Sequence, residues 1–251
     1  MSSEWYTGAT LGNYSVAHDL SDIARCFALE GKRIVSDPKS LVSYHEADDV
    51  HFYVKRYYRS GKYLRKFLGR SRVKAEWENL LLFRSWGIAT PEMLAWGEER
   101  SLLRFRRGAL VTVAVENAVD MKKLSIRYGD YFFNKSRFRE LAGQVADYTR
   151  RMHQHGFAHG DLNWRNILVS YDPAATGQPA RVIFFDCPAG RFWWGPFLSR
   201  RILKDLAHLD KMARTCLPLK WRLWFFRQYT GRNRLTPADK VLLRKIHCYF
   251  D

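Results

Sequence analysis

Long apolar segments are missing from this sequence. No apolar run in its 251 residues approaches the about 18–20 residues that a membrane-spanning helix needs. The N-terminal stretch MSSEWYTGATLGNYS has neither a basic nor an apolar segment, so we expect no signal peptide. Low-complexity tracts are also absent, and 47% of the residues are apolar and 27% charged. This balance predicts a globular fold and argues against disorder.

Cysteines are few and scattered. The four of them, Cys26, Cys187, Cys216 and Cys248, form no CxxC pair. We interpret them as free thiols in a reducing cytoplasm.

Acidic residues are too few to balance the basic ones. The sequence has 42 Lys and Arg against 25 Asp and Glu, a formal net charge of +17. Such a charge favours anionic partners, namely nucleic acid, phosphorylated metabolites or an acidic membrane leaflet. Aromatic residues make up 15%, including nine Trp, and several lie beside basic residues. That mixture suits a membrane interface or stacking on bases, and composition alone leaves both open.

The order of the remaining patterns predicts an α+β protein with two lobes. Strand-like alternation covers 32–58, 90–99 and 102–116, and helical spacing covers 74–86, ending at Gly87. A second helix is expected over 137–155, followed by the short strands NILVSY and ARVIFFD and then by helices interrupted at Pro218. We therefore expect a β-rich N-terminal lobe (1–117), a linker around 113–119, and a larger, mainly helical C-terminal lobe (118–251).

A set of polar residues interrupts the apolar pattern of the C-terminal half. Asp161 and Asn166 in HGDLNWRNIL follow the catalytic-loop pattern HxDxxxxN, and Asp186 ends the strand ARVIFFD. Phosphoryl transfer from ATP needs a carboxylate that orients the attacking hydroxyl and hard oxygen ligands for Mg²⁺. We expect Asp161 to accept the hydroxyl proton and Asn166 and Asp186 to bind the metal. The alternative is that all three are polar residues of turns at strand ends.

Two residues of the N-terminal half complete the set. Lys55 lies near the end of the half-buried strand VHFYVKRYY, and we expect it to contact the α- and β-phosphates. Glu76, in the first turn of the following helix, would pair with Lys55 and fix its position. The alternatives are Lys62, Lys66 and Lys74 for the lysine and Glu78 for the carboxylate.

The order Lys, Glu, Asp, Asn, Asp matches the protein-kinase-like fold, and further details resemble one family. Gly160 and Asn163 stand where regulated protein kinases usually carry arginine and lysine, a form that resembles the small-molecule phosphotransferases. Together with YVKRYY, AEWENLLLFRSWGIATPEMLAWGE and SRRILKDLAHLDK, these residues look like the lipopolysaccharide kinase family, the Kdo and heptose kinases (WaaP type) of Gram-negative bacteria. The similarity covers roughly residues 30 to 230.

That resemblance implies a bilobal kinase fold that uses ATP and Mg²⁺ to phosphorylate a heptose or Kdo hydroxyl of the lipopolysaccharide inner core. The expected partners are the lipopolysaccharide core or its precursor and an anionic membrane surface, at the cytoplasmic face of the inner membrane; nucleic acid is not expected. Asp205, in LKDLAHL, resembles the helix aspartate that braces the catalytic loop in this fold, although it could be an ordinary exposed helix charge.

Some features depart from the kinase pattern. No GxGxxG motif is present, and SDPKS occupies the turn that should cover the phosphates. Asp186 is followed by Cys187 and Pro188. Because proline stiffens the backbone, we expect that the loop at the metal-binding aspartate does not switch between two conformations. A kinase for another small molecule or for protein tyrosine, and a non-catalytic kinase-like scaffold in lipopolysaccharide assembly, are the alternatives.

For the histidines and the aromatic–basic segments, a structural role is an alternative to a functional one. His159 is expected to be a structural, hydrogen-bonding residue, and its cluster with His153 and His155 lacks the Cys or acidic partners of a zinc site. The segments RFWWGPFL (191–198) and KWRLWFFRQ (220–228) fit either core packing or a peripheral membrane anchor. The basic connector 56–74 fits either a solvated face or an anion-attracting surface.

Overall fold

The computed structural model describes residues 2–59, 69–102, 104–171 and 179–251. Two of the alternative lysines, Lys62 and Lys66, and the middle of the basic connector, residues 60–68, lie outside these residues. The chain forms two compact units: Met1–Leu81 with Pro91–Val115, and Leu82–Thr90 with Glu116–Asp251. Each unit is described by itself below.

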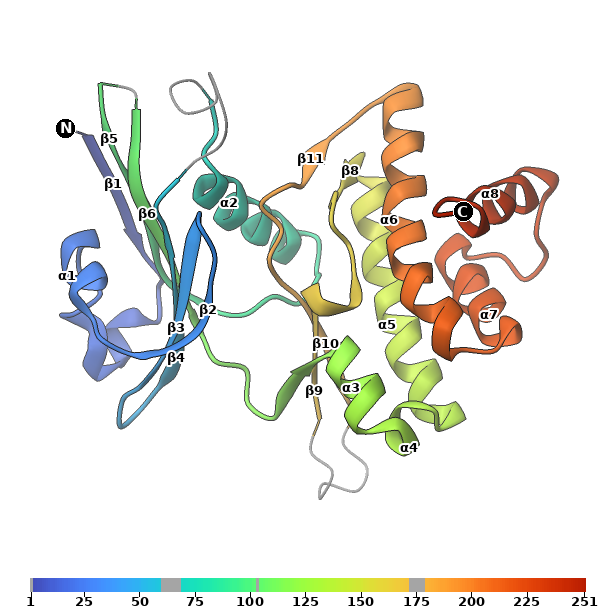
Figure 1. Ribbon diagram of the computed structural model, residues 1–251, viewed down its shortest axis with the longest axis horizontal. Helices are drawn as coiled ribbons and strands as arrows, with labels where there is room; N and C mark the ends of the chain where they lie inside the picture. Colours follow the sequence, from blue (N-terminus) through green and yellow to red (C-terminus); the bar gives the residue numbers. More distant parts are fainter. Residues whose placement is uncertain (1, 60–68, 103, 172–178) are drawn as a thin grey trace. The chain divides into compact units, whose positions relative to one another are not determined.

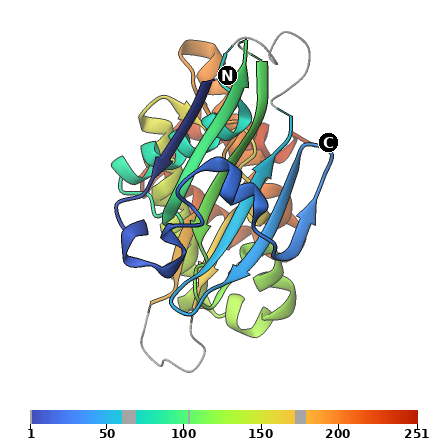
Figure 2. The same cartoon turned by 90° about the vertical axis from the view of Figure 1, so that its left-hand side faces the viewer.

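The first unit is built on a six-stranded antiparallel sheet (Figures 1 and 2). Its strand order is β1-β5-β6-β4-β3-β2, so β1 and β2 form the two edges. The strands are β1 (Ser2–Thr7), β2 (Lys32–Ser36), β3 (Ser40–Glu46), β4 (His51–Tyr57), β5 (Met93–Ser101) and β6 (Arg104–Val113). The strands expected over 90–99 and 102–116 are therefore confirmed as β5 and β6, which pair with each other.

Strand β4 shows why this part of the sequence forms a sheet. Phe52 and Val54 are buried on one face, while Tyr53 and Lys55 alternate with them. The buried face packs on Leu20 and other apolar residues of an N-terminal segment that contains α1 (Ile23–Ala28) and two 3₁₀ turns. In the register of the sheet, Lys55 lies between its neighbours on β3 and β6.

Helix α2 (Arg72–Ser85) follows the residues that the structure leaves undescribed and starts slightly earlier than expected. It buries Trp77, Leu80 and Phe83, which lie at helical spacing, while the neighbouring Leu81 is exposed. Gly87 adopts a left-handed conformation with φ of 69° just past the helix end, as its place in the sequence predicted.

The second unit is mainly helical and contains two small sheets (Figure 1). Its strands are β7 (Ala118–Asp120), β8 (Phe157–Ala158), β9 (Ile167–Ser170), β10 (Arg181–Phe184) and β11 (Arg191–Phe192). Its helices are α3 (Met121–Arg127), α4 (Gly129–Phe132), α5 (Lys135–Gln154), α6 (Gly195–Cys216), α7 (Leu219–Thr230) and α8 (Pro237–His247). A sheet in the N-terminal part and a helical remainder confirm the predicted α+β class.

Helix α5 has a row of apolar residues at helical spacing that pack inside this unit. Phe138, Leu141, Val145 and Met152 are all buried, and Phe138 stacks on Trp221 of α7 with ring centres 4.3 Å apart. Leu206 of α6 joins Phe226 of α7 and Ile246 of α8 in a further buried cluster. None of the helices among the described residues is both long and apolar enough to cross a membrane.

Candidate active site

In the first unit, the structure brings Lys55 and Glu76 together. The Lys55 ammonium lies 2.9 Å from both carboxylate oxygens of Glu76, and Tyr57 donates its hydroxyl to the same carboxylate. The Glu76 side chain is 4% exposed and that of Lys55 19%. Because α2 begins at Arg72, Glu76 lies in its second turn, not in the first as the sequence suggested. The result is a shielded ion pair that fixes the lysine on β4.

The alternatives to this pair have other partners. Glu78 binds Arg70, with Oε2 2.5 Å from the guanidinium Nε and both side chains about a third exposed. Lys74 binds Glu4, and this contact raises the pKa of the lysine. Among the described residues, the geometry thus favours Lys55 and Glu76 over their competitors.

The turn between β2 and β3 contains the segment SDPKS, which was expected at the position of a glycine-rich loop. Asp37 accepts hydrogen bonds from the backbone N–H groups of Lys39 (2.6 Å) and Ser40 (3.0 Å), which hold the pKa of its carboxyl below the usual range. Backbone N–H groups are what a glycine-rich loop offers to phosphates. Asp37 accepts hydrogen bonds from two of them, so these N–H groups are used inside the turn.

In the second unit, the catalytic-loop pattern forms a compact turn between β8 and β9. The Asn166 amide donates to the backbone carbonyl of Asp161 at 2.8 Å and lies 3.3 Å from its carboxylate. Asn163 donates to the Asp161 carboxylate at 3.0 Å. The Asp161 side chain nevertheless stays 57% exposed. The loop therefore presents an oriented carboxylate that remains accessible to an incoming hydroxyl.

Asp205 of α6 binds the backbone of the catalytic loop, as its resemblance to the helix aspartate of the kinase-like fold implied. It is fully buried and accepts the N–H groups of His159 (2.7 Å) and Gly160 (2.9 Å). Burial opposes ionisation, yet the hydrogen bonds and the charge of neighbouring His153 hold the pKa of Asp205 below its usual value. Gly160 has φ of 80°, a conformation that side chains rarely adopt, so the glycine here meets a backbone requirement.

His159 differs from its prediction as a hydrogen-bonding side chain. Its ring is completely buried against Phe83, and neither ring nitrogen has a hydrogen-bond partner among the described residues. Burial lowers the pKa of the imidazole, which keeps it neutral. The residue contributes through packing and through its backbone N–H, because the ring is sequestered from solvent.

Helix α6 places two further side chains against the loop that sequence reasoning missed. Lys204 donates to the backbone carbonyl of Gly160 at 2.8 Å, and the His208 imidazole lies 3.8 Å from the Asp161 carboxylate. Burial lowers the pKa of His208, and the nearby Lys204 charge acts in the same direction. Their spacing of four residues was the only sequence signal, since it puts the two side chains on one face of α6.

Asp186 lies at the same end of the β9–β10 pair as Asn166. Ile167 pairs with Phe184 across the two strands, and the next residue, Phe185, donates its N–H to the Asn166 carbonyl. Asp186 has φ of 55°, an unfavourable conformation for a non-glycine residue that is typical of functional sites. Cys187 is buried beneath the loop, with its sulfur 3.8 Å from the His159 carbonyl.

The residues present fit a magnesium ion. With its amide nitrogen committed to Asp161, Asn166 has its carbonyl oxygen left as the atom suited to a metal. The Asp186 carboxylate would be a second hard oxygen ligand, and Mg²⁺ prefers one or two such ligands together with phosphate oxygens. The assignment of Asn166 and Asp186 to a metal stays a prediction from the sequence pattern.

Comparisons with known proteins identify the fold and the family of this chain. The fold is similar to that of WaaP in complex with acyl carrier protein, with a TM-score of 0.73 and 22% identity over 99% of this chain and 100% of that one. This likeness confirms the predicted kinase-like fold. A search of curated proteins finds no match. The model of the lipopolysaccharide kinase (Kdo/WaaP) family, however, matches residues 30–241, and the chain belongs to this family.

Proposed function

We propose that this protein transfers a phosphoryl group from ATP, with Mg²⁺, to a heptose or Kdo hydroxyl in the inner core of lipopolysaccharide. The observation that carries the proposal is the loop around Asp161. Its carboxylate is oriented by Asn163 and Asn166 yet remains accessible, and Asn166 adjoins a second metal-binding candidate, Asp186. Membership of the lipopolysaccharide kinase family supports the substrate class.

Each residue has a defined task in this proposal. Asp161 accepts a hydrogen bond from the sugar hydroxyl, orients its oxygen toward the γ-phosphate and takes up the proton as the bond to phosphorus forms. Asn166 and Asp186 hold Mg²⁺, which neutralises phosphate charge when bound. Lys55, fixed by Glu76, contacts the α- and β-phosphates. Residues 1–117 then form the nucleotide side and 118–251 the acceptor side of one kinase domain.

The proposed place of action is the cytoplasmic face of the inner membrane of a Gram-negative bacterium, with the protein bound peripherally. The net charge of +17 supports it, because the lipopolysaccharide core and the surrounding lipids are anionic.

The direct test uses the purified chain with Mg²⁺, ATP and isolated core oligosaccharide. Wild type is expected to transfer phosphate, and the Asp161→Asn variant to lose at least about a hundredfold in rate while ATP still raises its melting temperature. Transfer to tyrosine peptides or to free sugars, but not to the oligosaccharide, would favour the other kinase acceptors. The absence of any Mg²⁺-dependent stabilisation by ATP would favour a non-catalytic scaffold.

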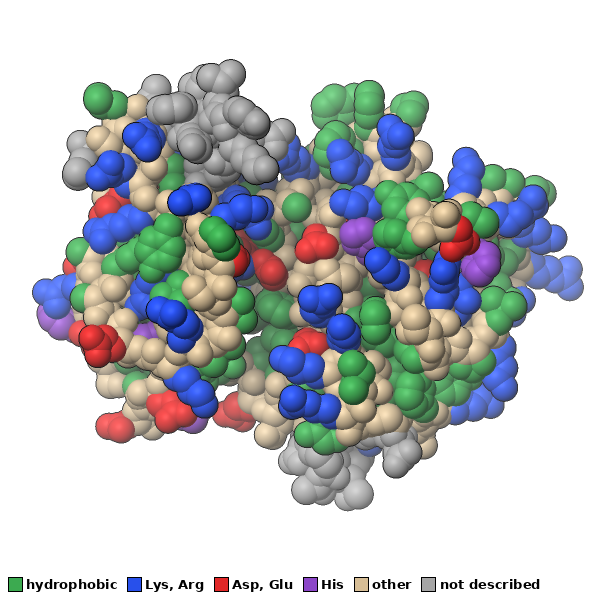
Figure 3. Space-filling view, in the orientation of Figure 1, with side chains coloured by type: hydrophobic (Ala, Val, Ile, Leu, Met, Phe, Trp, Pro, Cys, Tyr) green, Lys and Arg blue, Asp and Glu red, His purple; other side chains and the backbone are tan. Residues whose placement is uncertain are grey.

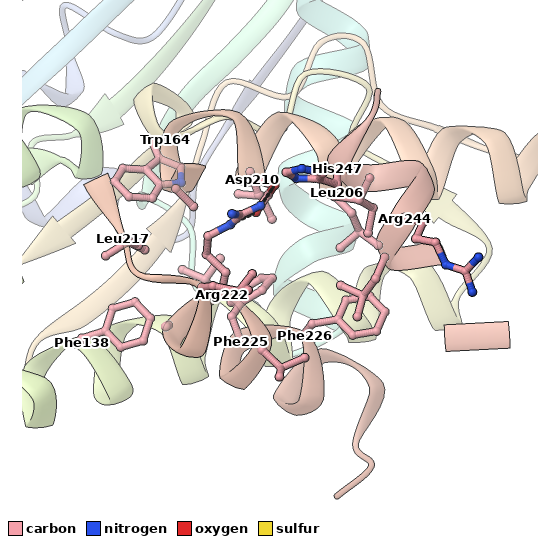
Figure 4. A pocket seen from close by; sticks show the side chains of 18 of the residues that line it. Phe138, Trp164, Leu206, Asp210, Leu217, Arg222, Phe225, Phe226, Arg244 and His247 are labelled. Carbon is pink, nitrogen blue, oxygen red and sulfur yellow. Dashed lines mark hydrogen bonds and ion pairs between the residues drawn. The ribbon is translucent and has the colours of Figure 1, made fainter. Parts of the chain in front are cut away.

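A second partner is suggested by a cavity in the helical unit. The space is about 350 Å³ and lies among α5, α6, α7 and α8 (Figure 4). Its lining is almost entirely apolar and includes Phe138, Trp164, Leu206 and Phe226. The related WaaP is known in complex with acyl carrier protein. We infer that this chain also binds an acyl carrier protein, whose fatty chain the cavity accepts.

Filling the cavity tests this inference. Ala213 lines the space, so Ala213→Phe is expected to abolish the preference for acylated over unacylated carrier protein in a calorimetric titration. Ala238, exposed on α8, offers the matched control Ala238→Phe, which should bind as wild type. Equal binding of both carrier forms by wild type would contradict the inference.

A further inference from the structure

The start of α6 exposes an unusual set of side chains. Phe192 is 51% exposed, Trp194 75% and Phe197 61%, although all three are large and apolar. Arg191, Arg200 and Arg201 lie beside them in the sequence, and together these six residues are named the α6 tip. Figure 3 shows hydrophobic side chains gathered over the start of α6, with Lys and Arg side chains next to them.

The other aromatic–basic segment, residues 220–228, packs within the helical unit. Residues 220–228 form most of α7, where Phe226 is buried and Trp221 stacks on Phe138. Arg222 of this segment forms an ion pair with Asp210 at 2.6 Å. Core packing therefore accounts for the second segment. It does not account for Trp194 and Phe197 of the α6 tip, which are largely exposed, whereas the half-exposed Phe192 also contacts the Phe157 ring.

The α6 tip is held in place by regular structure. β11 pairs with β8, so that Phe192 lies opposite Phe157, and Trp193 donates its backbone N–H to Gly156 at 2.8 Å. Pro196 lies in the first turn of α6. Arg201 lies over the Trp193 ring, with 4.5 Å between the guanidinium carbon and the ring centre. The exposed rings are thus presented by a fixed scaffold.

The chemistry of the α6 tip matches an anionic membrane surface. Aromatic rings partition to the headgroup level of a bilayer, and basic residues nearby are attracted to anionic lipids. The sequence from 191 to 204, RFWWGPFLSRRILK, contains four basic residues and no acidic one. We propose that Phe192, Trp194 and Phe197 insert at the interface of an anionic membrane while the arginines of the α6 tip bind lipid phosphates.

The same helix connects the α6 tip to the catalytic loop. Lys204 and His208, further along α6, contact Gly160 and Asp161. From position 194 to position 208 a helix rises by about 21 Å at 1.5 Å per residue. With Trp194 at the membrane interface, Asp161 is held within about that distance of the lipid, a range that suits sugars close to a lipid anchor. This depth argument rests on the proposed function, whereas membrane binding itself does not.

Vesicle sedimentation with the full chain tests the α6 tip without any need for activity. We expect binding to vesicles of phosphatidylglycerol and phosphatidylethanolamine and little binding to phosphatidylcholine. Trp194→Ala with Phe197→Ala should weaken binding at least about tenfold, and Arg200→Glu about fivefold or more. The matched controls are Leu102→Ala with Ile126→Ala, which removes two other exposed apolar side chains, and Arg234→Glu.

Three outcomes would overturn the proposal. They are no binding of wild type to anionic vesicles, equal losses in the tip and control variants, and loss of self-association instead of lipid binding in the tip variant. Measurements of kinase activity distinguish a failure of the membrane-binding proposal from a failure of the proposed function. Trp194→Ala with Phe197→Ala should keep the wild-type rate on soluble core oligosaccharide and lose rate on lipopolysaccharide in membranes. Inactivity of wild type on both acceptors would reject the proposed function alone.

Discussion

Asp161 keeps more than half of its side chain in solvent while the amides of Asn163 and Asn166 fix its orientation. The contrast with Asp205, which is fully buried and spends both oxygens on backbone N–H groups, shows how environment separates two carboxylates with the same chemistry. The first is available to a substrate. The second is a positioning residue that maintains the shape of the loop.

Glu76 and Glu78 offer a matched comparison at the residue scale. Glu76→Gln removes the carboxylate from a shielded pair and leaves the Lys55 ammonium without its fixed counter-charge. We expect kcat/KM for ATP to fall about 10- to 100-fold, or about 1.4–2.7 kcal/mol. Glu78→Gln breaks only a more exposed pair with Arg70 and should change this value by less than about twofold. Steady-state kinetics that show equal losses would contradict the assignment of Glu76.

Some of these residues could be predicted from the sequence and others could not. Lys55 and Glu76 were identifiable because strand alternation and helix position are local properties. Lys204 and His208 were not, because Lys204 meets Gly160 across 44 positions of sequence and only the packing of α6 brings them together. The hydrogen-bonding prediction for the His159 ring was wrong because burial of a ring nitrogen is a tertiary property.

At the scale of the elements, α6 stabilises the catalytic loop through Asp205. Asp205→Asn leaves only one acceptor oxygen for the N–H groups of His159 and Gly160. We expect a loss of about 1–3 kcal/mol at neutral pH, because one buried donor loses its partner. Each kcal/mol should lower the melting temperature by about 2–4 °C for a chain of this size.

The pH dependence of that loss has a defined sign. The folded-state pKa of Asp205 lies below its unfolded value, so the stabilisation is present above the unfolded pKa and is lost as pH falls through the folded pKa. Melting curves between about pH 7 and pH 3 should show the gap between wild type and Asp205→Asn narrowing under acid. Asp19→Asn, at an exposed position, is the control and should show no gap. A gap that stays constant with pH would contradict this account.

Helices and strands with a regular spacing of apolar residues could be predicted from the sequence. Strand β4 and helix α5 have regular apolar spacing, and both appear close to their expected positions. β1 and α1 were not predicted, because the first thirty or so residues carry no clear period; β1 is fixed by pairing with β5. An edge strand of this kind gains its conformation from the sheet it joins, which local sequence does not reveal.

At the scale of the whole molecule, charge and fold point to the same type of substrate. The net charge of +17 favours an anionic surface, and the family match and the kinase-like fold indicate a lipopolysaccharide kinase. Composition alone left nucleic acid and membrane open, because charge is a property of the entire surface. The structure shows which aromatic residues are exposed, as in the α6 tip, and which are packed, as in α7.

The central claim is that Asp161 supports phosphorylation of a core sugar, and mass spectrometry of core oligosaccharide tests it most directly. Cells that lack the gene would carry wild type, Asp161→Asn or Asp19→Asn, with equal protein levels checked by immunoblot. Wild type and Asp19→Asn should restore one phosphate on the inner core, and Asp161→Asn should not. Full restoration by Asp161→Asn, or an unchanged core in cells lacking the gene, would contradict the account.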